Sequence, residues 1–165
     1  MKRHYFWLLS LLAITAFAAC NKKDDAPPFD PVAQAAIDEK LIKDYIANNN
    51  ITGTVKDDTT ALHYKILERG TTPGDTIELN ERMNITYEGK LLNGNTFDSG
   101  TKTTLRDYRL QELIEGWKIG LRKISKGDKI QLFVPSAMGY KNFPTGGIPA
   151  NSVLIFTVTL HDFYF

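Results

Sequence analysis

The chain has 165 residues, of which 42% are hydrophobic and 24% charged, and its 20 basic side chains nearly balance its 19 acidic ones. This composition fits one ordinary globular domain with an appendage and excludes a disordered or fibrous protein. The charge balance offers no basic patch for nucleic acid, and the histidines lie at no metal-ligand spacing, so we expect neither nucleic-acid binding nor a bound metal.

The first residues have the pattern of a secretory signal. Lys2 and Arg3 precede an apolar run that continues to Phe17, and small residues then lead to Cys20, the single cysteine of the chain. The run is too short to span a bilayer comfortably. We therefore predict that residues 1–19 are a signal peptide, absent from the mature protein.

The segment around Cys20 allows two interpretations. Ala18, Ala19 and Cys20 resemble a lipobox, whose cysteine is acylated and becomes the new N-terminus, although Phe17 replaces the usual leucine. The alternative is an apolar cysteine in a plain signal peptide. The first interpretation is favoured, and it places the protein outside the cytoplasm of a Gram-negative bacterium. There it would be lipid-anchored in the outer membrane, on the periplasmic or surface face. A lone cysteine also excludes an internal disulfide.

Residues 20–29 are typical of a flexible tether because they are charged, contain two prolines and have no apolar periodicity. Their basic-then-acidic run resembles a surface-export signal of some Gram-negative lipoproteins, or is only a solvated linker.

A helix is predicted over residues 30–50. Asp30 can cap its first turn, and Pro31 needs no N–H at that position. Asparagines end the pattern, and an apolar stripe runs along the helix, formed by Ile37, Leu41, Ile42, Tyr45 and Ile46. The stripe either packs on the helix's own domain or forms a dimerising or client-binding arm. The first alternative is favoured.

From Ala61 onward the apolar period changes to two, which predicts half-buried strands. The alternation covers Leu62–Glu68, Met83–Glu88 and Val153–Leu160. Lys129–Val134 is a further predicted strand, Asn93-Gly94 is a turn, and Leu110–Leu121 is the one helical candidate. The pattern predicts an α+β domain over residues 55–165, with an antiparallel sheet and one short helix.

Three motifs follow one another over residues 61–165. Met83–Ser99 combines alternating aliphatics with Tyr-x-Gly, a turn glycine and Phe-Asp-Ser, and Leu113–Leu121 places an aliphatic pair before Gly-Trp and a later glycine. The third motif comprises Pro135-Ser136, Gly139-Tyr140, Gly147-Ile148-Pro149 and Leu154-Ile155-Phe156. In this order they resemble the FKBP-type peptidyl-prolyl cis-trans isomerase family.

The resemblance implies an FKBP-like fold, a five- or six-stranded antiparallel sheet curved around one short helix with a shallow pocket between them. It also implies a set of pocket residues: Trp117 as the floor, Tyr87, Phe97 and Phe156 as walls, Leu113, Ile114 and Ile148 as the substrate-binding rim, and Asp98 and Tyr140 as polar groups. The backbone N–H of Ile148 is expected to meet a substrate carbonyl. For any one aromatic residue, plain core packing is the alternative.

Such a pocket suits rotation of Xaa-Pro bonds without nucleophile, metal or cofactor. Unaided rotation has a barrier near ~20 kcal/mol and takes tens to hundreds of seconds. The resemblance implies proline-containing polypeptide clients among exported proteins, whose folding the enzyme would assist, and macrolide inhibitors as ligands. The alternative is a binding or chaperone-like module of the same fold with little catalytic turnover.

The sequence departs from the family pattern in three places. The stretch between Ser99 and Leu113 is shorter than usual, so the basic partner of Asp98 and one wall aromatic stay open, with Arg106 and Tyr108 as candidates. Lys141 follows Tyr140 where glycine is usual, and Ala150 follows Pro149 where a second proline is usual. We expect the last two changes to affect client preference or macrolide binding more than catalysis.

Overall fold

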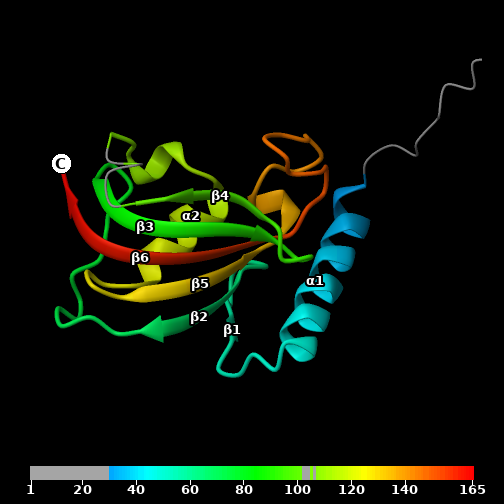
Figure 1. Ribbon diagram of the computed structural model, residues 1–165, viewed down its shortest axis with the longest axis horizontal. Helices are drawn as coiled ribbons and strands as arrows, with labels where there is room; N and C mark the ends of the chain where they lie inside the picture. Colours follow the sequence, from blue (N-terminus) through cyan, green and yellow to red (C-terminus); the bar gives the residue numbers. More distant parts are fainter. Residues whose placement is uncertain (1–29, 102–104, 106) are drawn as a thin grey trace, which may run out of the picture.

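The computed structural model describes residues 30–101, 105 and 107–165 of the chain (Figure 1). The predicted signal peptide, Cys20, the tether and Arg106 lie outside these residues. The elements are α1 (Pro31–Asn48), β1 (Val55–Lys56), β2 (His63–Glu68), β3 (Arg82–Leu91), β4 (Thr96–Gly100), η1 (Leu110–Glu112), α2 (Glu115–Gly120), η2 (Leu121–Lys123), β5 (Lys129–Val134), η3 (Ser136–Met138) and β6 (Leu154–Tyr164), where η marks a 3₁₀ turn. No helix in the described part is long and apolar enough to cross a membrane.

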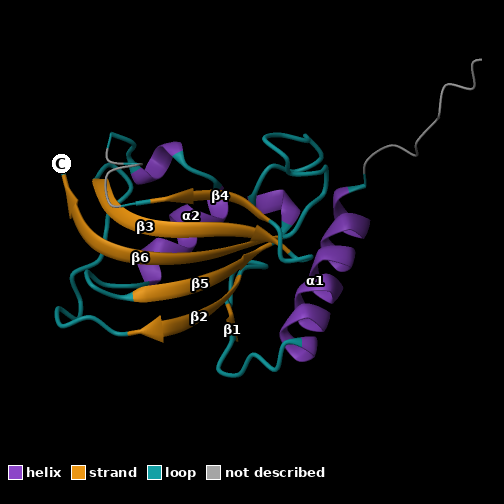
Figure 2. Ribbon diagram, viewed as in Figure 1, coloured by secondary structure: helices purple, strands orange, loops and turns teal. Residues whose placement is uncertain are grey.

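Six antiparallel strands form one sheet in the order β1-β2-β5-β6-β3-β4. The long strands β3 and β6 pair from Arg82↔Tyr164 to Leu91↔Leu154, with a register shift between Asn84 and Ile85. Figure 2 shows α2 against one face of the curved sheet and α1 across the end where β3 and β5 finish. The predicted α+β class, antiparallel sheet, short helix and N-terminal helix are confirmed.

Strands β2, β3, β5 and β6 form where the sequence predicted strands, whereas the short strands β1 and β4 were not predicted. In β3 the side chains of Met83, Ile85 and Tyr87 are buried and alternate with more exposed neighbours. The bounds of β5 match the predicted strand, whereas β6 extends beyond it to Tyr164 because its C-terminal half pairs with the start of β3. The Asn93-Gly94 turn is also confirmed, since Gly94 has φ +88 and donates its N–H to the Leu91 carbonyl.

Helix α1 begins as predicted and packs on its own domain. Asp30 accepts hydrogen bonds from the N–H groups of Val32 and Ala33, at 2.9 and 3.1 Å. The helix ends at Asn48, short of residue 50, because Asn50 takes a left-handed conformation with φ 52.

The predicted apolar stripe of α1 is correct only in part. Ile42 is fully buried and Tyr45 packs against Phe133, but Ile37 is 51% exposed and Leu41 39% exposed. The buried face is rotated because the carboxylate of Asp38 is fully buried in place of an apolar side chain.

The short helix is present, but its predicted bounds, Leu110–Leu121, are too long. Leu113 and Ile114 have extended backbones, with ψ 174 and 153, and separate η1 from α2. Gly116 and Gly120 then let α2 approach β5 closely, since a Cβ on either would come within 2.5 Å of Val134 or Leu132.

Candidate active site

A continuous series of aromatic rings lies between α2 and the sheet. Trp117, on α2, meets Tyr87 of β3 at 5.3 Å between ring centroids and Phe156 of β6 at 5.2 Å, both edge to face. Phe97 of β4 extends the series by meeting Phe156 at 5.6 Å. This offset geometry is the favoured one for aromatic pairs. The strand register therefore brings residues from four elements into one apolar wall.

The rings border a cavity of about 220 Å³, which is lined by Tyr87, Asp98, Leu105, Glu112, Leu113, Ile114, Trp117, Tyr140 and Phe156. A second hollow of about 170 Å³ shares Asp98 and Tyr140 with it and is lined in addition by Phe97, Thr145, Gly146 and Ile148. The structure thus gathers all the sequence-predicted pocket residues here, with Phe97 and Ile148 lining the second hollow and not the first.

Asp98 has a hydroxyl partner in the cavity wall. The Tyr87 hydroxyl donates to Asp98 Oδ2 at 2.9 Å, because β3 and β4 pair with Gly89 opposite Asp98. Tyr87 is 6% exposed, and burial, followed by the hydrogen bond to Asp98, raises its pKa. Burial and the nearby Asp98 charge also raise the pKa of Tyr140. Both phenols therefore stay protonated at neutral pH: Tyr87 donates its O–H to Asp98, and the hydroxyl of Tyr140 can donate to a bound molecule.

The expectation for the Ile148 backbone is wrong. Its N–H donates to the Thr145 carbonyl at 2.7 Å within a tight turn, so it is not available to a substrate carbonyl. The turn forms because Gly146 and Gly147 both have positive φ, a conformation that glycine adopts without steric cost.

Two N–H groups of cavity-lining residues have no acceptor among the described residues. One is the buried indole N–H of Trp117. The other is the backbone N–H of Ile114, which precedes α2 and whose own carbonyl accepts from Trp117 and Lys118. An unpaired donor beside an aromatic cavity favours an acceptor on the bound molecule. The extended break before α2 carries the Ile114 group, which the prediction of one continuous helix did not reveal.

Leu105 and Glu112 line the cavity and were also missed. Glu112 accepts a hydrogen bond from the Arg109 N–H at 2.7 Å, which fixes its position at the start of η1. The signal for Glu112 was its place directly before the Leu113-Ile114 pair, and for Leu105 it was a single apolar residue within a polar segment. Of the open candidates for the partner of Asp98, Tyr108 is 51% exposed and does not line the cavity, and Arg106 lies outside the described residues.

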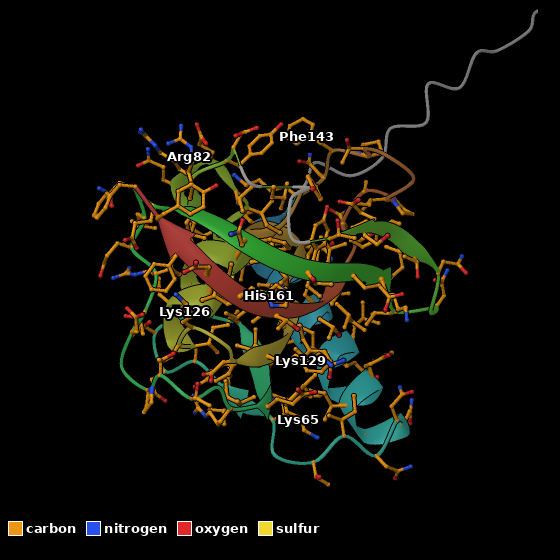
Figure 3. All side chains as sticks on the ribbon, turned by 60° about the vertical axis from the view of Figure 1, so that its left-hand side comes forward. Lys65, Arg82, Lys126, Lys129, Phe143 and His161 are labelled. Atoms are coloured by element: carbon orange, nitrogen blue, oxygen red, sulfur yellow. The ribbon has the colours of Figure 1, made fainter. Side chains whose placement is uncertain are left out.

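The loop over the site carries a lysine with a left-handed backbone and an exposed phenylalanine. Lys141 has φ 58, which explains why glycine is usual there, and Phe143 is 67% exposed at the surface (Figure 3).

Among the residues that the structure describes, no group of three or more histidine, cysteine, aspartate or glutamate side chains could hold a metal ion.

Comparison of the sequence with known proteins finds matches to one family. The sequence profile of the family described as FKBP-type peptidyl-prolyl cis-trans isomerase matches residues 74–161. The chain is 37% identical over 109 residues to the FKBP-type peptidyl-prolyl cis-trans isomerase FkpA of Escherichia coli K12, covering 66% of this chain and 40% of that protein. It is 39% identical over 110 residues to a probable FKBP-type peptidyl-prolyl cis-trans isomerase of Haemophilus influenzae, covering 66% of this chain and 45% of the relative. The chain therefore spans less than half the length of these relatives.

Solved structures show the same fold. The crystal structure of FkpA from Escherichia coli superposes with a TM-score of 0.64 at 31% identity, covering 80% of this chain and 62% of that one. A peptidyl-prolyl cis-trans isomerase from Pseudomonas syringae superposes with a TM-score of 0.67 at 24% identity, covering 84% of this chain and 99% of that one, and supports the fold alone.

Proposed function

This chain belongs to the FKBP-type peptidyl-prolyl cis-trans isomerase family, and on that basis we propose that it accelerates rotation about Xaa-Pro bonds in exported proteins and so aids their folding. The observation that carries the proposal is the aromatic cavity at Trp117, with the Tyr87–Asp98 hydrogen bond at its edge.

The cavity favours the twisted form of the bond over its planar forms. A planar amide is strongly dipolar, whereas a twisted amide has lost its resonance and is less polar, so a dry aromatic wall stabilises the twisted form relative to water. Shortening the half-time to about a millisecond requires roughly 7 kcal/mol of such differential stabilisation. Trp117 and Phe156 supply the apolar contact surface for the proline ring.

Hydrogen-bond donors supply the rest of the stabilisation. Tyr140 and Ile114 line the cavity, which supports a role for the Tyr140 hydroxyl and the Ile114 N–H as donors to the carbonyl that rotates out of conjugation. Asp98 holds the Tyr87 ring against Trp117 through its hydroxyl. Leu113, Ile114 and Ile148 contact the residue before proline, which favours an apolar side chain there. Macrolide inhibitors would occupy the same cavity.

The proposal extends to the organisation of the chain. Residues 1–19 are the signal peptide, Cys20 carries the lipid, residues 20–29 are the tether and residues 55–165 form the isomerase domain. Small residues before a single cysteine support the lipid anchor. The protein then acts outside the cytoplasm, on the outer membrane. Mass spectrometry of the membrane fraction tests this, because lipid on Cys20 is expected, and membrane association that survives Cys20→Ser would contradict it.

The activity is tested by proline-isomerisation kinetics on residues 20–165 carrying Cys20→Ser. Faster cis-trans exchange in short Xaa-Pro peptides is expected without added metal or nucleotide. Rates equal to the uncatalysed control, for protein that circular dichroism shows to be folded, would instead support the binding or chaperone-like module. What supports that alternative is that no ion pair within the described residues includes Asp98.

A further inference from the structure

Asp38 is a buried carboxylate on α1, far in sequence from the cavity. It is 0% exposed, and its Oδ2 accepts hydrogen bonds from the Ser136 N–H at 2.7 Å and the Ser136 hydroxyl at 2.6 Å. Its Oδ1 accepts from the Gln34 side chain at 2.7 Å. None of the ion pairs formed within the described residues includes Asp38. Within the described residues, the polar contacts of Asp38 are therefore hydrogen bonds alone.

Ser136, fully buried in η3, stands at the base of the loop that covers the candidate active site. Its carbonyl accepts from the N–H groups of Gly139 and Lys141, at 3.0 and 2.8 Å, on either side of Tyr140. The Lys141 carbonyl in turn accepts from the Asn151 N–H at 2.8 Å, which closes the loop of residues 141–151. Hydrogen bonds thus connect α1 to Tyr140 through a single buried serine.

Contacts other than the Asp38 carboxylate also hold α1 on the domain. The same helix is held by buried Ile42 and by Glu39, whose Oε2 lies 3.0 Å from His63 Nε2 and 3.2 Å from Lys56 Nζ. A buried charge is costly, and an apolar side chain of similar volume generally docks a helix at least as well. A carboxylate differs from an apolar group in that its hydrogen bonds are directional, so it fixes both the N–H and the hydroxyl of Ser136.

We propose that Asp38 is a positioning residue for the isomerase site: through Ser136, helix α1 fixes the loop that places Tyr140 at the cavity. The proposal rests on the proposed function, since it assigns α1 a part in turnover. It also makes a claim about loop order that does not depend on activity.

The kinetic test compares variants of two adjacent residues, Asp38 and Glu39. Each variant is expressed as the full chain and purified in its mature form. Asp38→Ala should lower kcat/KM by about 5-fold or more in folded protein, mostly through kcat, because Tyr140 is held less well. Asp38→Asn keeps an acceptor for Ser136 and should restore kcat/KM to within about twofold. Glu39→Ala is the matched control on the same helix. It should lower thermal stability and leave kcat/KM within about twofold.

Amide hydrogen exchange of residues 139–151 provides a readout that does not depend on turnover. Asp38→Ala should accelerate exchange in this loop by about 10-fold or more, while amides of β3 and β6 change by less than about twofold, and Glu39→Ala should leave the loop unchanged.

If Asp38→Ala does not fold, Ser136→Ala takes its place, and selective acceleration in the loop supports the proposal. Unchanged loop exchange in the folded variant, or kcat/KM within twofold for Asp38→Ala, would overturn it. Absence of isomerase activity in the wild type would reject the proposed function, while the exchange data would still decide the placement of the loop.

Discussion

Alternate residues of the same strands point to the two faces of the sheet, and a different helix packs against each face. Along β5 and β6, Leu132 and Phe156 join the cluster on the α2 side, while their neighbours Phe133 and Ile155 join the cluster under α1. Helix α1 has 18 residues and buries Phe133 completely, whereas α2 has only 6 and leaves a cavity of about 220 Å³ beside its aromatic rings. A hollow of similar volume also lies beside α1, but no aromatic side chain lines it, so the two helices leave cavities of different chemistry.

The largest expected effect is on kcat/KM, and it is tested by one substitution on each face of the sheet. Trp117→Leu and Phe133→Leu should each destabilise the fold by about 2–3 kcal/mol, because each removes buried aromatic volume. In folded samples Trp117→Leu should also lower kcat/KM by about 30-fold or more, since the cavity floor is lost. Phe133→Leu should leave kcat/KM within about twofold. Thermal unfolding and peptide kinetics at a temperature well below both midpoints measure the difference.

Equal kinetic losses in the two variants would show that the rings act only through packing. The site would then have to be placed elsewhere, even though the family assignment would stand.

A smaller effect is expected at Asp98, within the cavity face. Asp98→Ala should lower kcat/KM by about 10-fold, which corresponds to about 1.4 kcal/mol. It should also cost about 1 kcal/mol of stability, because the buried Tyr87 hydroxyl loses its acceptor. Tyr87→Phe removes only the hydroxyl and separates the two contributions. If Asp98 acts by holding Tyr87, both variants should lose activity to a similar extent. Kinetics and thermal unfolding of the pair check this.

A stability loss in Asp98→Ala with unchanged kcat/KM would instead make Asp98 a turn-capping residue of β4. The pocket role proposed for it would then be wrong.

The parts of this comparison that the sequence predicted are local ones. The bounds of β5 follow from a short apolar-rich run, and the start of α1 follows from the Asp30 cap, because both depend on neighbouring residues. The burial of Asp38 was not predictable, since its partner Ser136 lies 98 residues away. The bonding of the Ile148 N–H to Thr145 was missed for a different reason, because it depends on the backbone of a glycine turn.

The candidate site divides in the same way. Tyr87 and Asp98 were both predicted as pocket residues, but their hydrogen bond arises from the β3–β4 register, which turn and bulge geometry sets. The break at Leu113-Ile114 was not predicted. The spacing of apolar residues in this stretch fits one continuous helix and also fits an extended segment followed by a helix.

On the α1 side of the sheet, the ion pairs of Glu39 predict that the free energy of unfolding depends on pH. Burial of Glu39 acts to raise its pKa, but hydrogen bonds from His63, Lys43 and Lys56 outweigh it and lower the pKa to about 2. Because the folded pKa lies below the unfolded value, Glu39 stabilises the fold above about pH 5, and this contribution disappears as pH falls toward 2. The contribution is about 1 kcal/mol after allowance for solvent screening. Glu39→Gln should therefore flatten the stability profile between pH 5 and about 2 in urea unfolding, and an unchanged slope would contradict the assignment.

The smallest effect is expected at Lys141, in the loop over the cavity. Its φ of 58 is in the left-handed region, which costs a residue with a Cβ about 1–2 kcal/mol, while glycine loses about 0.5–1 kcal/mol more backbone entropy on folding. Lys141→Gly should therefore stabilise the fold by about 0.5 kcal/mol, a rise in Tm of about 1–2 °C. Asn50→Gly, just after α1 at φ 52, is the matched control and should give no rise, because asparagine tolerates this conformation. Differential scanning calorimetry of both variants measures the contrast. A lower Tm for Lys141→Gly would mean that contacts of the lysine side chain stabilise the loop by more than the left-handed backbone costs it.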